Sequence, residues 1–228
     1  MPRIVDVREG ILKKNDMLAR DLRARFRDAH VFVASLVSSP GAGKTELLQK
    51  TLAAFKDTWA VGALVGDLAT DRDARRLLQT GVRVQQITTG TVCHLDAQMV
   101  NKALDAWDLD ALDVLFVENV GNLVCPSSYD LGEHVRIVLL SVTEGEDKPL
   151  KYPTIFNTAD LAVITKIDLA GAVGFDRDEA LRNIQEVRPG LEVLEVSART
   201  GAGMDRWLSR LLELAQVQSL RQQLPVRG

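Results

Sequence analysis

Seven short apolar runs alternate along the chain with stretches of helical periodicity. The runs contain few polar residues, a pattern typical of parallel strands that are covered on both faces. The predicted strands span residues 31–37, 60–66, 82–88, 112–117, 134–142, 161–167 and 191–196. This alternation predicts an α/β fold with three layers: one doubly wound, mainly parallel sheet with helices on both faces and right-handed crossovers.

Apolar residues spaced three and four apart predict the helices between these strands. The predicted helices span residues 7–30, 47–55, 71–80, 94–107 and 176–187, with a last one ending near residue 218. Leu95, Met99, Ala103 and Trp107 share one side of their helix, which we interpret as core packing. Segment 143–153 is a polar connection that contains prolines. We expect a helical segment (1–30) on or beside the main domain (31–220), and a polar tail (221–228).

The bulk composition indicates one globular domain. Of the 228 residues, 46% are hydrophobic and 26% charged, as in ordinary soluble domains. The net charge of −3 argues against a nucleic-acid partner. No apolar stretch reaches the ~20 residues that span a bilayer, so we expect no membrane partner. The mixed N-terminal residues do not resemble a secretory signal, and we expect a cytoplasmic protein without disulfides.

The strongest motif is the stretch from Ser38 to Thr45, SSPGAGKT, which lies between the first strand and a helix. It resembles G-x-x-x-x-G-K-[ST], with Ser38 at the first glycine position, where serine requires a negative φ. In such loops backbone N–H groups converge on a phosphate chain, the lysine contacts the β- and γ-phosphates, and the Thr hydroxyl ligates Mg²⁺. The predicted phosphate-binding residues are Ser39, Pro40, Gly41, Ala42, Gly43, Lys44, Thr45 and Glu46.

A second motif, Thr165-Lys166-Ile167-Asp168, ends the sixth predicted strand and has the form [NT]-K-x-D. A carboxylate at Asp168 can accept hydrogen bonds from guanine N1–H and its N2 amine, which adenine does not offer. The stem of Lys166 would lie over the base. The loop Ser197-Ala198-Arg199 after the next strand matches the loop that contacts the guanine O6. Together these motifs predict binding of GTP and GDP.

Three acidic residues are candidates for Mg²⁺ and for the attacking water: Asp67, Asp73 and Glu118. Carboxylates near Thr45 would complete an oxygen site suited to Mg²⁺. We assign Lys44 and these three acids to catalysis; helix caps and solvated loop acids are the alternative interpretation. No glutamine or arginine is placed in an assignable catalytic position, which predicts slow turnover, typical of a switch.

Cys93-His94 and Cys125-Pro126 form another candidate site. Both cysteines follow strands on the edge of the sheet where the nucleotide motifs lie. Two thiolates and one imidazole suit Zn²⁺ or Ni²⁺. The spacing by itself is a weak metal signature, and buried structural cysteines remain the alternative.

Several longer stretches closely resemble the HypB family of nickel-incorporation GTPases, which belong to the SIMIBI class of P-loop GTPases. They are SSPGAGKT, GDLATDRDARRL, TTGTVCHLDAQMV, ENVGNLVCPSSYDLGEHVRIVLLSVTEGEDKPLKYP, TKIDL and VSARTGAG. The resemblance covers nearly all of residues 31–212. CHLDAQMV and GEDKPLKYP are far more specific than a phosphate loop. The related urease accessory GTPase has Cys-Pro-His, whereas Ser127 follows Cys125-Pro126 here.

The resemblance implies a homodimer promoted by GTP, with a metal site of Cys93, His94 and Cys125 at or near its interface. It also implies nickel delivery to the hydrogenase large subunit, together with a HypA-type nickel chaperone. Some members carry an N-terminal Cys-rich motif or a His-rich store. This sequence shows neither and contains three histidines, so we expect the central metal site to act alone. The alternative function is a related P-loop accessory NTPase or phosphotransferase with structural cysteines.

Overall fold

The strands pair in the order β3-β2-β4-β1-β5-β6-β7, and every pairing is parallel. The computed structural model describes residues 5–223, with side chains described from 10 to 218. The first four residues of the expected segment 1–30 and residues 224–228 of the expected tail lie outside this range. The strands are β1 (Phe32–Ser38), β2 (Val61–Asp67), β3 (Arg83–Thr88), β4 (Val114–Glu118), β5 (Val135–Ser141), β6 (Leu161–Thr165) and β7 (Val193–Val196).

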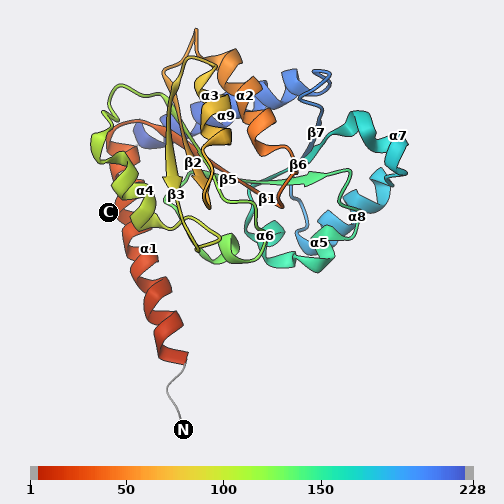
Figure 1. Ribbon diagram of the computed structural model, residues 1–228, viewed down its shortest axis with the longest axis horizontal. Coiled ribbons are helices and arrows are strands. Elements are labelled where there is room, and N and C mark those ends of the chain that lie inside the picture. Colours follow the sequence, from red (N-terminus) through yellow and green to blue (C-terminus); the bar gives the residue numbers. More distant parts are fainter. Residues whose placement is uncertain (1–4, 224–228) are drawn as a thin grey trace.

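The helices fill the connections between these strands (Figure 1). They are α1 (Val5–Asp28), α2 (Lys44–Phe55), α3 (Arg72–Leu78), α4 (Ala97–Ala103), α5 (Lys148–Lys151), α6 (Pro153–Thr158), α7 (Ala170–Val173), α8 (Arg177–Val187) and α9 (Met204–Gln223). Within residues 5–223, three 3-10 turns accompany them: η1 (Leu104–Ala106), η2 (Cys125–Ser128) and η3 (Ile167–Leu169).

Side chains that alternate along each strand pack into separate layers on the two faces of the sheet. On β1, Ala34 and Leu36 join a core with α2, α3 and α9, whereas Val33 joins a core with α1 and α4. A third cluster packs α6 and α8 under β5 and β6. Because strands covered on both faces need apolar side chains in both directions, the continuous apolar runs correspond to these strands. The predicted three-layer α/β fold is confirmed.

The strand order reverses direction at β1, which lies between β4 and β5. From β1 the chain winds to one edge of the sheet and then, from β5, to the other. In such sheets ligands bind outside the carboxyl ends of the strands at this reversal. The glycine-rich loop follows β1 directly, so the fold places it at the expected ligand position.

Helix α1 packs against α4, and its N-terminal end extends away from the rest of the molecule (Figure 1). Its C-terminal half packs against the molecule through the buried side chains of Ala19, Leu22 and Phe26. Gly132 lies so close to it that an added Cβ would be 2.8 Å from the Cβ of Leu22. The chain segment around Gly132 therefore follows α1 at backbone distance.

Two local predictions differ from the structure. The helix expected over 94–107 begins only at Ala97, because the side chain of Asp96 caps it by accepting a 2.7 Å hydrogen bond from Met99 N. His94 thus lies in a loop, and η1 continues the helix to Ala106. The connection expected over 143–153 instead contains α5 and leads into α6, and both helices have a proline near their first turn.

None of the helices in the described range is long and apolar enough to cross a membrane.

Candidate nucleotide and metal sites

The phosphate loop joins β1 to the first turn of α2. Gly41 and Gly43 have φ of 76° and 95°, values that glycine adopts without strain. The φ of Ser38 is not positive, which is the condition under which serine can occupy the first glycine position of the motif. The Lys44 ammonium donates a 2.8 Å hydrogen bond to Ser38 Oγ. Burial lowers the pKa of Lys44, while Glu118 and Asp73 act in the opposite direction.

Glu118 ends β4 and lies beside the start of α2. Its Oε1 accepts a 2.7 Å hydrogen bond from the Thr45 hydroxyl. Its Oε2 is buried and has no hydrogen-bond partner among the described residues. Burial raises the pKa of Glu118 to about 7, against the opposing effects of Lys44 and the Thr45 hydrogen bond. A buried carboxylate oxygen without a donor, next to a Thr hydroxyl, suits a bound cation.

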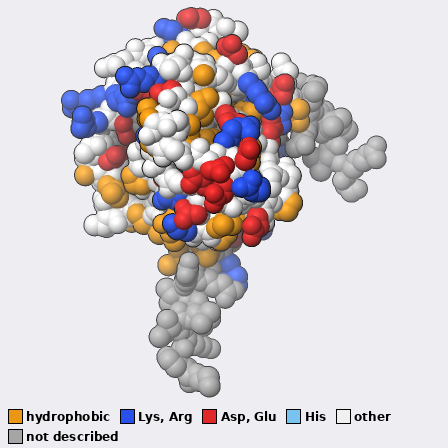
Figure 2. Space-filling view, turned by 90° about the vertical axis from the view of Figure 1, so that its right-hand side faces the viewer, with side chains coloured by type: hydrophobic (Ala, Val, Ile, Leu, Met, Phe, Trp, Pro, Cys, Tyr) orange, Lys and Arg blue, Asp and Glu red, His pale blue; other side chains and the backbone are white. Residues whose placement is uncertain are grey.

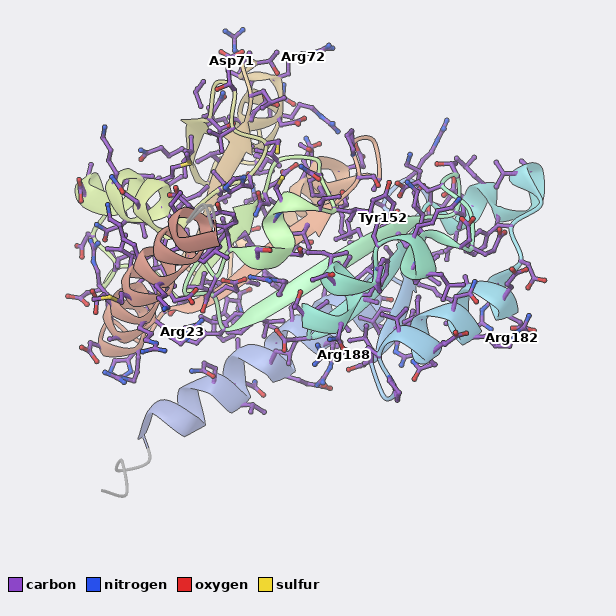
Figure 3. The ribbon with its side chains drawn as sticks, turned by 90° about the horizontal axis from the view of Figure 1, so that it is seen from below. Arg23, Asp71, Arg72, Tyr152, Arg182 and Arg188 are labelled. Atoms are coloured by element: carbon purple, nitrogen blue, oxygen red, sulfur yellow. The ribbon has the colours of Figure 1, made fainter. Side chains whose placement is uncertain are left out.

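A cleft of about 420 Å³ lies over the phosphate loop. Asp67, at the end of β2, and Asp73, in the first turn of α3, line it together with Glu118. Asp67 also accepts hydrogen bonds from the backbone N–H of Ala69 and Thr70, at 2.9 and 2.8 Å. The structure therefore brings the three predicted acids and Lys44 into one cleft. After Asp67 the chain reaches the outer edge of the molecule at Asp71 and Arg72, where α3 begins (Figure 3).

Arg76 of α3 also lines this cleft, which sequence reasoning did not predict. It forms an ion pair with Glu46 and contacts the Gln49 side chain. A helical arginine among other arginines gives no local signal of its orientation. Its guanidinium is a second positive group, after Lys44, that lines the same cleft.

A second cavity, of about 490 Å³, lies on the other side of Gly43. Asp168 accepts a 2.6 Å hydrogen bond from the Ser197 hydroxyl. Thr165 and Lys166 donate 2.6 Å hydrogen bonds to the carbonyl oxygens of Ala42 and Gly41. The predicted base-binding loops are thus bonded to each other and to the phosphate loop. The predicted residues that line this cavity are Thr165, Lys166, Asp168, Ser197, Ala198 and Arg199.

The two cavities share Gly43 and Glu46 and therefore adjoin each other across the phosphate loop. One is bordered by Lys44 and carboxylates, and the other by the [NT]-K-x-D residues. A nucleoside triphosphate has this division, with charged phosphates at one end and a base at the other. Of the predicted residues, Ser39 and Ala42 are buried in the loop, and neither lines either cavity.

The face beside the second cavity is rich in charge. It is formed around α7 and α8, and Figure 2 shows acidic side chains gathered there, with Lys and Arg side chains next to them. Arg177 of α8 pairs with Glu195 at 2.6 Å and with Asp178 at 3.2 Å. Ion pairs of this exposed kind contribute little to stability.

Cys93, His94 and Cys125 form one cluster, in which one possible ligand atom from each residue lies within 4.8 Å of the others. The Sγ atoms of the two cysteines are 3.1 Å apart, and no disulfide joins them. Cys93 and His94 lie in the loop before α4, and Cys125 begins η2. The fold thus brings together residues that are 32 positions apart, and this N/S set fits Ni²⁺ or Zn²⁺.

Side chains around the cluster hold its ligands in place. The ring of His94 stacks on Tyr129 with centroids 3.9 Å apart, and His94 Nδ1 is buried with no partner in the described structure. Burial lowers the pKa of His94, which favours the neutral imidazole that binds metals. Asn122 Nδ2 donates a 3.3 Å hydrogen bond to the Cys93 carbonyl. Sequence reasoning had not identified Tyr129 or Asn122.

One short segment connects the two sites. Glu118 and Asn119 line the phosphate cleft, and six residues after Asn119 the chain reaches Cys125. Asn119 Oδ1 accepts a 3.0 Å hydrogen bond from Leu95 N, next to His94. An added Cβ on Gly121 would lie 2.9 Å from Pro40 Cα, so this segment also packs directly on the phosphate loop.

Known proteins resemble this chain over most of its length. The family profile described as CobW/HypB/UreG, nucleotide-binding domain, matches residues 32–195. The hydrogenase maturation factor HypB of Azotobacter chroococcum mcd 1 is 48% identical over 209 residues, covering 91% of this chain and 68% of that protein. The chain belongs to the HypB family. The expected family is confirmed, and its nucleotide-binding domain includes the phosphate loop described above.

Two solved HypB structures share this architecture. The crystal structure of HypB from Helicobacter pylori, in complex with nickel, has a TM-score of 0.85 and 41% identity, and the match covers 90% of this chain and 97% of that one. HypB from Archaeoglobus fulgidus has a TM-score of 0.83 and 36% identity, with 89% and 99% covered. The P-loop fold is therefore common to the family members compared.

Proposed function

We propose that this protein is a GTPase whose nucleotide state controls a nickel site during hydrogenase maturation. Residues 31–220 would form the GTPase domain. The predicted phosphate-binding residues from Ser39 to Glu46 would hold the phosphates, and Asp168 would select guanine. The adjoining cavities on either side of Gly43 support a ligand with a phosphate end and a base end.

Thr45 and Glu118 are the best candidates to hold Mg²⁺, with Asp67 and Asp73 in the same cleft. The fit rests on the buried Oε2 of Glu118, which has no donor in the described structure. When bound, Mg²⁺ neutralises charge on the β- and γ-phosphates. Lys44 contributes positive charge at the same phosphates, and a carboxylate of Asp67 or Asp73 orients the attacking water.

Hydrolysis to GDP and phosphate is proposed to be slow. The described residues that line the phosphate cleft include no glutamine. Glutamine is the side chain that orients the attacking water in fast signalling GTPases. A slow intrinsic rate keeps the GTP state long enough to act as a switch.

Nickel is proposed as the cargo, bound by Cys93, His94 and Cys125. Two thiols and a neutral imidazole within 4.8 Å are a suitable donor set, and Zn²⁺ fits the same set. The Helicobacter pylori relative, whose crystal structure is a complex with nickel, supports this choice of metal. A homodimer promoted by GTP, a HypA-type chaperone as the nickel source and the hydrogenase large subunit as the acceptor complete the proposal, with the cytoplasm as its location.

The observation that carries the proposal is the segment from Glu118 to Cys125. It begins with a hydrogen bond to Thr45, packs on Pro40 at Gly121, and contacts the Cys93 loop through Asn119 and Asn122. A γ-phosphate or Mg²⁺ that moves Glu118 or Gly121 would move a segment that bears a metal ligand. Nucleotide and nickel affinities must then change reciprocally, by one and the same factor.

Light scattering of the purified chain tests this function. The protein is measured with GDP or a non-hydrolysable GTP analogue, with and without nickel, alongside Cys93→Ala. We expect a dimer with the GTP analogue and a response to nickel in the wild type only. An unchanged mass in every condition, together with equal nickel affinity in both nucleotide states, would refute the switch.

A further inference from the structure

Asn15 of α1 forms hydrogen bonds to the backbone next to both loops that carry the predicted metal ligands. Its Oδ1 accepts a 2.9 Å hydrogen bond from Ala97 N, three residues after His94. Its Nδ2 donates a 2.9 Å hydrogen bond to the Asp130 carbonyl, one residue after Tyr129. The side chain is only 5% exposed and lies 82 and 115 positions from these partners.

The two partners of Asn15 belong to the two halves of the cluster. Ala97 starts α4 directly after the loop of Cys93 and His94, whereas Asp130 follows the turn that begins with Cys125. No backbone pairing joins the loop 89–96 to the segment 125–131 among the described hydrogen bonds. The side-chain amide of Asn15 uses one acceptor and one donor, and it therefore links the backbones of two segments that have no described backbone hydrogen bond to each other.

Neighbouring contacts align the same segment on α1. Arg23 lies about two helical turns after Asn15 on α1. It donates hydrogen bonds of 2.7 and 2.8 Å to the Asp130 carboxylate (Arg23 is marked in Figure 3). Arg136 donates a 2.8 Å hydrogen bond to the Tyr129 carbonyl. The Tyr129 ring stacks on His94, so a shift of the backbone at residues 129–130 would be transmitted to the imidazole.

We propose that Asn15 is a positioning residue for the metal site: it sets the separation of the Cys93–His94 loop and the Cys125 turn, and makes α1 a structural part of that site. Outer residues that orient metal ligands typically change metal affinity by about 10–100-fold when they are removed. The proposal rests on the proposed metal site for its effect on nickel, but the loop separation itself is a property of the metal-free chain.

The test uses the full chain with Asn15→Ala and Asn15→Asp. Aspartate retains an acceptor for Ala97 N but has no donor for the Asp130 carbonyl. Asn183→Ala is the matched control, because Asn183 is also buried, at 9% exposure, and donates a 3.0 Å hydrogen bond to the Glu146 carbonyl away from the metal cluster. Thermal unfolding and GDP affinity are measured for each variant to account for general loss of structure.

The first readout is nickel titration, followed by the thiolate-to-nickel charge-transfer absorption. We expect both Asn15 variants to bind nickel about 10–100-fold more weakly than the wild type and with an altered band, while Asn183→Ala binds as the wild type does. GDP affinity without nickel should stay within about twofold in every variant, because Asn15 does not line the nucleotide cavities.

The second readout needs no metal. Oxidised glutathione converts the Cys93 and Cys125 thiols into a disulfide; the two thiols lose two electrons and two protons, and two glutathione thiols form. The equilibrium reports how well the two loops hold the sulfurs together. We expect both Asn15 variants to shift it toward the thiols by about tenfold or more.

The outcomes separate this inference from the proposed function. Wild-type nickel affinity and wild-type disulfide equilibrium in Asn15→Ala would overturn the positioning role. Equal losses in Asn183→Ala would overturn it too, as would wild-type behaviour of Asn15→Asp, which lacks the bridging donor. If the wild type binds no nickel but the Asn15 variants weaken disulfide closure, the nickel function fails and the positioning role stands.

Discussion

The Thr45 hydroxyl donates a 2.7 Å hydrogen bond to Oε1 of Glu118, which joins the first turn of α2 to the last residue of β4. Glu118 is 3% exposed, and Lys44, which interacts with it electrostatically, is also buried. A protein that needed only stability would not bury a carboxyl group whose second oxygen has no donor. The arrangement is better explained by a ligand that supplies positive charge.

Glu118→Gln should therefore stabilise the nucleotide-free protein at high pH. Burial raises the pKa of Glu118 from its ordinary value of 4.5 to about 7, so the folded state binds this proton more tightly than the unfolded state. The contribution of Glu118 to stability then falls as pH rises from about 4.5 to about 7, by at most about 3 kcal/mol. Urea unfolding at pH 5 and pH 8 measures the effect, which glutamine removes.

The same variant should bind Mg²⁺–GTP more weakly, because a neutral amide is a poorer Mg²⁺ ligand than a carboxylate. In the wild type, Mg²⁺-dependent GTP affinity should increase between pH 6 and pH 8 as Glu118 loses its proton, and this increase should be absent in Glu118→Gln. Equal Mg²⁺ dependence in both proteins at pH 8 would show that Glu118 does not act on the metal.

Asp168→Asn should change base selectivity. Asp168 is held by the Ser197 hydroxyl at 2.6 Å and lines the second cavity. An amide in its place cannot accept from both guanine N1–H and N2–H, and sites built around such hydrogen bonds lose about 100-fold or more in affinity. Xanthine has a carbonyl oxygen where guanine has the N2 amine, so the variant should bind XDP better than the wild type does.

Competition titrations with GDP, XDP and ADP measure this change. Ser197→Ala provides the control, because it removes the partner that orients Asp168 but keeps the carboxylate, and it should weaken GDP binding without improving XDP. Tight ADP binding by the wild type would contradict the guanine assignment.

The fold, and the grouping of most candidate-site residues at one edge of the sheet, could be predicted because their signals are local. The strands appear as continuous apolar runs with few polar residues, and the motifs around Lys44 and Asp168 each follow such a run within a few residues. Helices α5 and α6 have four and six residues, too short for a 3.6-residue period to appear. The roles of Asn15 and Tyr129 depend on partners far away in sequence, and no local pattern indicates such pairing.

His134 is a half-buried group that the sequence does not reveal, since it begins an apolar run like any strand-edge residue. Its Nδ1 accepts a 3.0 Å hydrogen bond from Val33 N, and its ring stacks on Phe32 with centroids 6.0 Å apart. Burial, with a smaller effect from Arg23, lowers the pKa of His134 to about 4. The folded state therefore keeps it neutral in mildly acidic solution.

This residue should make the protein less stable in mild acid. As pH falls from about 6.5 to about 4, the unfolded chain takes up a proton at His134 that the folded chain does not, which costs up to about 3 kcal/mol. His134→Gln lacks this titration, so its stability relative to the wild type should rise steadily over that range. Parallel pH profiles of the two unfolding free energies would contradict the assignment.

Asn119→Ala should weaken the coupling between the nucleotide state and nickel affinity. Asn119 is 2% exposed, lines the phosphate cleft, and accepts hydrogen bonds from Val120 N at 2.9 Å and Leu95 N at 3.0 Å. Truncation removes one of two described side-chain bonds from this segment to the backbone beside His94; the other is the bond from Asn122 to the Cys93 carbonyl. Couplings between sites are typically about 5–150-fold in affinity. The variant should bring the ratio of nickel affinities in the GTP-analogue and GDP states close to one.

Nickel titrations in both nucleotide states measure this ratio. Asn119→Asp keeps an acceptor oxygen and should retain part of the coupling, whereas Asn101→Ala, which removes a hydrogen bond that Arg25 of α1 donates to α4, should retain all of it. If Asn119→Ala keeps the wild-type ratio while the wild type shows coupling, the effect must pass through the other contacts of the same segment: the bond from Asn122 to the Cys93 carbonyl and the packing of Gly121 on Pro40.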